Sequence, residues 1–452
     1  MIGRRLSRFL DPSSSGRAAA GRPALAVLAA LGLALCAAGP AFAEERFPPP
    51  EFTGGYSLPE PTVPQPRATG MSVVDLAALA AALSLAAWLA IKVRSRRALF
   101  VLMVVSLLYF GFYRKGCVCP IGAIQNVALA LFSPDYPLPW IVAGFFVLPL
   151  VFALFVGRVF CGAVCPLGAI QDVFLIRPVK LPAGLSAALS VLPYVYLAVA
   201  VLYAVLGSTF LICEYDPFVA FFRLDGRFNL LLLGGSLLVI SMFVGRPYCR
   251  FLCPYGVLLG WLAPLARWRI KIHPKQCIQC RMCEEACPFG AILPATPEPK
   301  PERRYEGRLR LAGLLFALPA LVAAGAWLGR SGGDQLAQLN FTVALAGRIY
   351  AEEEKRVTGV TDESDAFRKQ GGAPEELYAS AEAIKGRFRS GATAVGAFLG
   401  LVVGWQLVAL STRRRRTEYL ADQSKCVACG RCYLACPGER ERLGLVGVVE
   451  AK

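Results

Sequence analysis

Apolar runs of about 20 residues alternate with short basic loops along most of the chain. Such a run is long enough for a helix to cross the hydrocarbon core of a bilayer. The pattern therefore predicts a polytopic α-helical membrane protein with about seven transmembrane helices in the mature chain. The predicted spans are 72–92, 98–113, 138–157, 184–206, 228–246, 309–328 and 391–411.

The N-terminal segment has the pattern of a secretory signal. Residues 1–43 combine arginines, an apolar stretch at 24–38 and the small-residue sequence "AFA" at 41–43, which predicts a cleaved signal peptide, with an uncleaved anchor helix as the alternative. Residues 44–70 are rich in proline and lack periodicity, which predicts an extended, exported linker.

The basic loops predict an orientation in the bacterial inner (cytoplasmic) membrane. With the mature N-terminus in the periplasm, the clusters at 94–97, 177–180, 267–271 and 413–416 all fall on the cytoplasmic side, as the positive-inside rule requires. The segment 330–390 then becomes an exported loop, which its composition predicts to be helical.

A cysteine-containing phrase repeats within the membrane domain, residues 71–270. "FVGRVFCGAVCP" at 155–166 returns as "FVGRPYCRFLCP" at 243–254, while "GCVCP" at 116–120 and "CEYDP" at 213–217 are shorter versions. In chain order, "GCVCP" is unit one, "FVGRVFCGAVCP" unit two, "CEYDP" unit three and "FVGRPYCRFLCP" unit four. Successive spans alternate in direction, so the four units are predicted to alternate between the two faces. The inner face would carry Cys161, Cys165, Cys249 and Cys253, and the outer face Cys117, Cys119 and Cys213.

Two further cysteine runs have the spacing of a bacterial ferredoxin. "CIQCRMCEEACP" at 277–288 and "CVACGRCYLACP" at 426–437 predict two [4Fe-4S] clusters, the fourth cysteine of each run serving the other cluster. A pair of zinc sites is the alternative. The halves, 271–300 and 413–452, are separated by a membrane hairpin at 305–412, which returns the chain to the cytoplasmic side. One cluster would use Cys277, Cys280, Cys283 and Cys436, and the other Cys426, Cys429, Cys432 and Cys287.

The repeated membrane cysteines admit three interpretations. The four inner thiolates hold an additional iron–sulfur centre, or they form thiol–disulfide pairs, or they are inert small apolar residues. We expect the proline after the second cysteine to end a helix and to free backbone amides near the sulfurs. The outer set is one short of an all-cysteine site, and Asp216 is a candidate fourth ligand.

Two other residues are candidates for a cofactor role. "SGAT" at 390–393 resembles the core of motifs that attach flavin mononucleotide to threonine, so Thr393 is a candidate flavin site, with small residues at a helix start as the alternative. His273 precedes Cys277 and either tunes the adjacent cluster or has no function. It is the only histidine, which excludes a bis-histidine haem and a blue-copper site.

Composition supports a membrane protein and excludes nucleic acid as a partner. Of 452 residues, 56% are hydrophobic, and the 16 cysteines lie mostly in ligand-like spacings. The net charge of +17 is explained by the positive-inside loops, because the basic residues gather beside apolar runs.

The "GR-x-[FY]-C-x3-C-P" phrases, "CEYDPF" and the ferredoxin runs together resemble the NosR/NapH-type membrane polyferredoxins, over residues 98–295 and 391–437. The resemblance implies transmembrane electron transfer between the quinone pool or a cytoplasmic donor and a periplasmic redox protein. It also implies a quinol dehydrogenase-like component of an oxidoreductase system. The positive charge expected on the cytoplasmic face suits an acidic ferredoxin or flavodoxin at that side. The chain lacks the exported flavin-binding domain of NosR, so a flavin would sit on a partner. A membrane thiol or metal reductase for cofactor assembly and a redox sensor are the alternatives.

Overall fold

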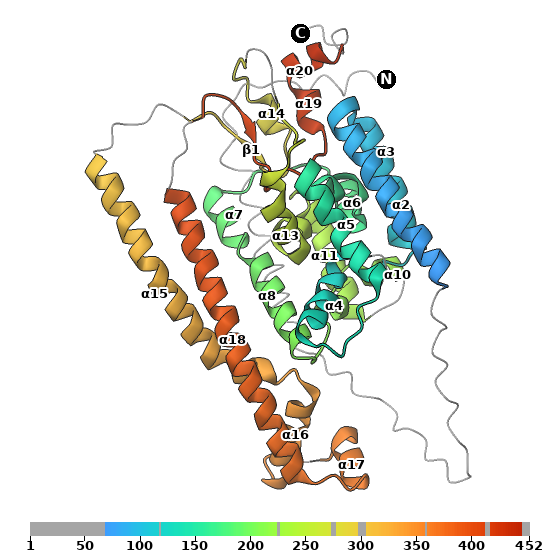
Figure 1. Cartoon of the computed structure of the whole chain (residues 1–452), viewed down its shortest axis with the longest axis vertical. Coiled ribbons are helices and arrows are strands. Elements are labelled where there is room, and N and C mark those ends of the chain that lie inside the picture. The colour runs from blue at the N-terminus through green and yellow to red at the C-terminus, as the bar shows by residue number, and fades with distance from the viewer. Residues whose placement is uncertain are drawn as a thin grey trace, which may run out of the picture. The chain divides into compact units, whose positions relative to one another are not determined.

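The computed structural model describes residues 68–116, 119–223, 227–272, 277–296, 304–357, 359–411 and 416–444. The predicted signal peptide, nearly all of the linker, Cys117 and His273 lie outside these ranges. The described part is mostly helical (Figure 1).

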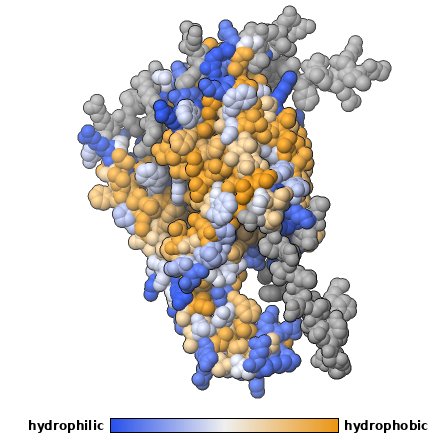
Figure 2. Space-filling view, turned by 45° about the vertical axis from the view of Figure 1, so that its right-hand side comes forward, coloured by the Kyte–Doolittle hydropathy of each residue, from blue (hydrophilic) through white to orange (hydrophobic). Residues whose placement is uncertain are grey.

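Five helical segments are long and apolar enough to cross a membrane, and they correspond to five of the predicted spans. Figure 2 shows the wide apolar surface that they contribute to, with hydrophilic residues gathered toward both ends. These segments contain α2 (Thr69–Trp88) with η2 (Leu89–Val93), α3 (Arg96–Ser106) with η3 (Leu107–Tyr113), α7 (Ala183–Leu189) with α8 (Leu192–Val205), α15 (Arg304–Ala337) and α18 (Pro374–Ser411).

The other two predicted spans are shorter in the structure. Span 138–157 is α5 (Trp140–Val156), and span 228–246 is α11 (Phe228–Ser241), which ends before the second "FVGR" phrase. Two apolar helices of similar length were not predicted, namely α4 (Pro120–Phe132) and α13 (Pro254–Leu262), the latter continued by η5 (Ala263–Leu265). The membrane domain therefore combines full-length helices with half-length ones.

The proline after the second cysteine stands at the end of a helix, as predicted, and it also starts the next one. Element η4 (Phe160–Val164) ends just before Cys165, and α12 (Pro247–Phe251) ends just before Cys253. Pro120, Pro166 and Pro254 each start a helix, with the preceding cysteine as the N-cap residue. Proline suits this first position because its fixed φ is helical and its missing N–H needs no partner. The helices begun in this way are α4, α6 (Pro166–Val173) and α13, and the short elements between them are η4 (Phe160–Val164), α9 (Leu211–Glu214), α10 (Val219–Arg223) and α12 (Pro247–Phe251).

Helices α15 and α18 form a hairpin whose backbones touch. Gly325 and Gly329 face Gly396 and Gly400, and a Cβ on Gly396 would overlap the carbonyl oxygen of Gly325. Glycines four residues apart allow this close approach within a bilayer. The predicted loop 330–390 is helical in its described residues. It contains the ends of α15 and α18 together with α16 (Phe341–Glu353) and α17 (Asp362–Lys369).

The two ferredoxin halves join in one small module, although the hairpin separates them in sequence (Figure 1). Its elements are α14 (Met282–Glu285), β1 (Ile292–Leu293), β2 (Leu420–Ala421), α19 (Arg431–Ala435) and α20 (Pro437–Arg442). Strands β1 and β2 pair antiparallel, Ile292 opposite Ala421. The ladder is extended by Asp422, whose N–H donates to the carbonyl of Ala291 at 2.7 Å.

Candidate iron–sulfur centres

The ferredoxin module contains two cavities, each lined by four cysteines from both halves of the chain. The first cavity is closed by Tyr419 and Ile272, and the second by Phe289 and Ile270. In each cavity three cysteines come from one run and the fourth from the other run, which is the crosswise arrangement that the spacing predicts. The first set is Cys277, Cys280, Cys283 and Cys436, and the second is Cys287, Cys426, Cys429 and Cys432.

The backbone of both runs follows the same unusual course. Gln279 and Arg281 in the first run, and Ala428 and Gly430 at the matching positions of the second, have positive φ between 51° and 75°. A residue other than glycine pays about 1 kcal/mol or more for this conformation, and such strain is typical of a ligand clamp. Successive turns of this kind direct amide N–H groups toward a bound anionic group.

Amide hydrogens reach the cysteine sulfurs directly. The N–H of Ala291 donates to Sγ of Cys287 at 3.4 Å, and the amides of Ala428 and Arg431 act in the same way on Cys426 and Cys429. Burial raises the pKa of Cys426 to about 12, and burial followed by the charge of Cys436 raises the pKa of Cys283 to about 11. Buried thiols of this kind become thiolates when a cationic centre binds them.

The geometry favours clusters over zinc. Within the described residues, no three histidine, cysteine, aspartate or glutamate side chains converge closely enough to hold a single metal ion. A zinc ion draws its sulfurs onto a small tetrahedron with Zn–S of about 2.3 Å, whereas a cubane separates its ligands by the width of a cluster. The cysteine-lined cavities therefore fit [4Fe-4S] clusters.

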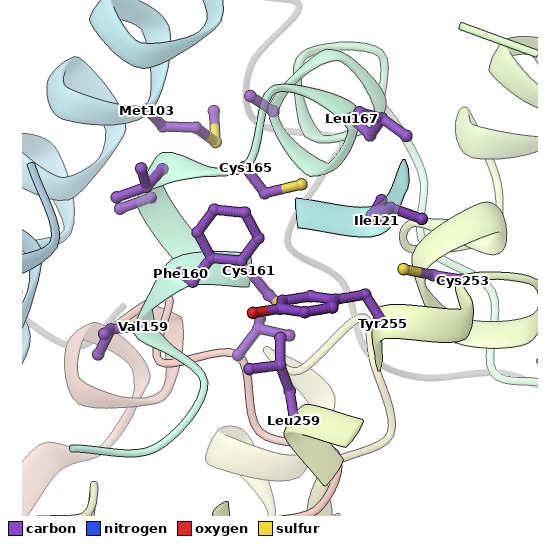
Figure 3. Close-up of a cluster of buried hydrophobic side chains, with 14 of the residues drawn as sticks. Met103, Ile121, Val159, Phe160, Cys161, Cys165, Leu167, Cys253, Tyr255 and Leu259 are labelled. Carbon is purple, nitrogen blue, oxygen red and sulfur yellow. The ribbon is translucent and has the colours of Figure 1, made fainter. Parts of the chain in front are cut away.

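The four cysteines predicted for the inner face, called the inner cysteines below, form a third group. Cys161, Cys165 and Cys253 are buried and Cys249 is partly buried, and the charge of each of the other three acts on Cys165. In Figure 3 the sulfurs of Cys165 and Cys253 point into the same interior space, which is bounded by Phe160, Tyr255 and Ile121. Cys161 lies in the π-helical turn η4, an irregularity that is often found at functional sites.

The arginine of each "FVGR" phrase contacts the unit that contains the other "FVGR" phrase. A guanidinium nitrogen of Arg246 lies 3.1 Å from the Cβ position of Gly168, and one of Arg158 lies 3.2 Å from that of Gly256. Arg246 also donates to the carbonyl oxygen of Cys161, and Arg158 approaches Sγ of Cys161 at 3.9 Å. Two buried positive charges therefore flank four potential thiolates. Sequence reasoning missed these arginines, although both stand at the same place in the repeat.

Helix α6 contributes two further residues that the sequence analysis did not single out. Gln171 accepts from the N–H of Tyr248 at 3.0 Å and donates to Sγ of Cys249 at 3.4 Å. Asp172 contacts three arginines, Arg246 at 3.5 Å, Arg96 at 2.9 Å and Arg431 at 3.2 Å. Burial alone would raise the pKa of Asp172, but these arginines lower it to about 2. The carboxylate thus links both membrane units to the ferredoxin module.

The second ferredoxin cavity rests directly on the inner cysteines. Gly162, between Cys161 and Cys165, leaves no room for a Cβ because the carbonyl oxygen of Val427 occupies that place. Arg158 also donates to the carbonyl of Ser424 at 2.6 Å. The run that supplies three cysteines to the second cavity is therefore in contact with the inner site.

Helix α20, which directly follows Cys436, anchors the second ferredoxin half. Where the first half continues with the apolar "FGAIL", the second has α20, and its Glu439 is fully buried. One oxygen of Glu439 lies 2.9 Å from Arg94 and 3.0 Å from Arg442. The two halves therefore pack differently after the cysteine runs.

The outer cysteines that the structure describes also lie near each other. The Cβ position of Gly122, three residues after Cys119, is 3.2 Å from Sγ of Cys213. The charges of Asp216 and Cys213 both act on Cys119. Cys117 lies outside the described residues.

Thr393 is placed within α18. Its hydroxyl donates to the carbonyl of Arg389 at 2.7 Å, one helical turn earlier. This is an ordinary role for a threonine inside a helix.

Comparison with known proteins agrees with these centres. A family model described as a 4Fe-4S binding domain matches residues 137–183 and 227–273, which contain both "FVGR" phrases. A second model with the same description matches 270–293 and 419–439, which contain both ferredoxin runs. The chain therefore contains 4Fe-4S binding domains.

Short segments also resemble curated proteins. YccM of Escherichia coli, whose name marks it as a candidate electron transport protein, is 38% identical over 68 residues, 15% of this chain and 19% of YccM. Protein NirI of Paracoccus denitrificans is 31% identical over 124 residues, 26% of this chain and 18% of NirI. The uncharacterised protein MJ0749 of Methanocaldococcus jannaschii is 31% identical over 67 residues, 15% of this chain and 27% of that protein.

The chain thus spans less than a fifth of the length of YccM and of NirI. No solved structure matches the chain. The domains and the similarities together support iron–sulfur electron transfer as its general activity.

Proposed function

We propose that the protein carries electrons across the bacterial inner membrane, between a donor at the ferredoxin end and a redox protein at the opposite face. The observation that carries the proposal is the contact of Val427, in the second ferredoxin run, with Gly162, between two inner cysteines. This contact places a ferredoxin cavity against the four membrane cysteines. Iron–sulfur clusters bound at these sites would supply one-electron carriers.

The residues around the inner cysteines favour a redox centre over inert packing. Arg158 and Arg246 are buried beside Cys161, and two buried charges are costly unless they offset an anionic group. Asp172 forms an ion pair with Arg246 but not with Arg158. It therefore offsets only part of this positive charge. A four-thiolate cluster would supply the remaining negative charge.

The partners follow from the two ends of the molecule. On the proposed cytoplasmic side, exposed basic residues such as Arg267 and Arg269 suit an acidic ferredoxin or flavodoxin, since complementary charge speeds encounter. The quinone pool is the alternative donor or acceptor, in the manner of a quinol dehydrogenase. At the opposite face we propose a periplasmic redox protein, which carries any flavin that the system uses.

The inner site decides between this function and a thiol–disulfide carrier. We would purify the full chain anaerobically with ⁵⁷Fe and compare it with Cys165→Ser by Mössbauer spectroscopy and thiol alkylation. A third [4Fe-4S] component that disappears in Cys165→Ser, while both ferredoxin components remain, supports the electron conduit. Two components in both proteins, with Cys161 and Cys165 cycling between alkylatable thiols and a disulfide, would overturn the conduit and establish the carrier.

A further inference from the structure

The outer cysteines that the structure describes are arranged in the same way as the inner ones. Cys119 is the N-cap of α4 as Cys165 is of α6, and glycine follows three residues later in both. Gln125 in α4 accepts from the N–H of Ile212, just before Cys213, at 3.0 Å. Gln171 in α6 accepts from the N–H of Tyr248, just before Cys249, at the same distance. Units one and three therefore meet as units two and four do.

A comparison of unit three with unit four shows that Asp216 corresponds to a cysteine of the inner site. In unit four the residue before the proline is Cys253, and in unit three the residue before Pro217 is Asp216. The carboxylate is 3% exposed, and its Oδ1 accepts from the N–H of Phe218 at 2.9 Å. Its charge acts on Cys119. A buried acidic group thus occupies the position of the fourth inner cysteine.

One buried polar atom beside the outer cysteines, Nε2 of Gln125, has no hydrogen-bond partner among the described residues. Gln125 is fully buried. The equivalent Nε2 of Gln171 donates to Sγ of Cys249. A buried donor without an acceptor is destabilising, so an anionic group bound beside Gln125 would remove this cost.

We infer that Cys119, Cys213 and Asp216 are ligands of a second membrane iron–sulfur centre, at the end of the domain opposite the ferredoxin module. The same arrangement of helix N-terminus, glutamine and paired units is found at the inner site, so a multi-iron cluster of the kind proposed there is the expected occupant. Mixed cysteine and non-cysteine ligation raises the reduction potential of such clusters in other settings. A carboxylate donor would distinguish this centre spectroscopically from the all-cysteine ones.

The position of the outer centre fits a further step in the proposed electron path. Ile121, two residues after Cys119, packs in the cluster that contains Cys165 and Cys253 (Figure 3). Tyr248 contacts both sites, because its N–H donates to Gln171 of the inner site and its ring packs edge-on against Phe218, two residues after Asp216, with 5.5 Å between the ring centroids. Cys213 is exposed, so the centre is within reach of a redox partner. The role of the outer centre in electron transfer rests on the proposed function. The presence of the metal does not.

Iron content and EPR of the full-length protein test the inference. Cys213→Ser combined with Asp216→Asn is compared with Glu214→Gln, a matched control at an exposed carboxylate two residues away. We expect the double variant to lose one EPR signal and its iron, while the ferredoxin signals and the inner-site signal remain. The control should retain all of them. Unchanged iron and spectra in the double variant would overturn the inference, as would a Cys119–Cys213 disulfide in the iron-loaded wild type.

Asp216→Cys separates ligation from a structural role. If Asp216 is a ligand, this variant keeps the centre but shifts its g values and lowers its potential, because a thiolate replaces a carboxylate. An unchanged spectrum would exclude Asp216 as a ligand. The presence of the outer centre without electron flow across the membrane would refute the proposed function alone, whereas electron flow without the outer centre would refute this inference alone.

Discussion

At the scale of residues, buried charged side chains surround the inner cysteines. Asp172 is fully buried among three arginines, and Arg158 lies beside Cys161. The cysteines could be predicted from their spacing, because ligand patterns are short and local. The ion-pair and carbonyl partners of the arginines and Asp172 could not be predicted, because they lie 74 to 266 residues away in sequence. A comparison of "AIQN" with "AIQD" in the repeats does mark position 172 as different.

Asp172→Asn should release the ferredoxin module from the membrane domain. The substitution leaves buried Arg246 without its charge partner, and breaking a buried ion pair in this way costs about 3–5 kcal/mol. We expect a lower Tm and faster proteolysis near residue 416 than for Asp135→Asn, a control at an exposed loop aspartate. Equal Tm and proteolysis in the two variants would show that Asp172 does not hold the module.

Arg158→Gln should lower the reduction potential of the inner centre. A nearby positive charge stabilises the reduced, more anionic state, and its removal should shift the potential by about 60 mV, which is a tenfold change for one electron. Redox titration by EPR measures the shift. Arg269→Gln, at an exposed arginine, should leave the potential unchanged, and equal potentials in both variants would contradict the proximity of Arg158 to a cluster.

At the scale of elements, half-length helices begun by Cys-Pro bring the sulfurs into the membrane domain. Each of Cys119, Cys165 and Cys253 sits at a helix N-terminus, where the amides and the helix dipole favour a thiolate. Hydropathy alone predicted the five long helices, since their apolar runs are uninterrupted. It missed α4 and α13, because these helices are too short to resemble a span and start at a residue that usually breaks helices.

Gly162→Ala should disturb the second ferredoxin site selectively. The new methyl group overlaps the carbonyl oxygen of Val427, so the run that carries Cys426 and Cys429 must move. We expect reduced occupancy of the second cluster with the first retained, measured by iron content and EPR. Gly184→Ala is the control because its Cβ meets no atom within 4 Å. Wild-type occupancy in Gly162→Ala would show that the contact is not required.

Gly396→Ala should separate the two hairpin helices. Its Cβ overlaps the carbonyl of Gly325, whereas that of Gly386, on the same helix, meets no atom within 4 Å. We expect Gly396→Ala to lower the yield of iron-loaded protein, because the hairpin returns the second ferredoxin half to the first. Gly386→Ala should match the wild type. Equal yields from both variants would show that close packing of the hairpin is dispensable.

At the scale of the whole molecule, three groups of four cysteines and an outer group follow one another from the ferredoxin module into the membrane domain. Two structural repeats, each a pair of units joined by a glutamine, account for the inner and outer groups. The crosswise pairing of the ferredoxin runs was predictable because their spacing is specific. The pairing of unit one with unit three, and of unit two with unit four, followed only from the predicted alternation of spans, since the contacts that join them are distant in sequence.

Electron flow across a sealed membrane tests the central claim most directly. The full chain is reconstituted into liposomes, with a membrane-impermeant reductant at the ferredoxin face and an impermeant acceptor at the other face. We predict reduction of the acceptor by the wild type and loss of at least tenfold in rate for Cys165→Ser, with both ferredoxin EPR signals intact. An equal rate in the two proteins, or no reduction by an iron-loaded wild type, would contradict the account.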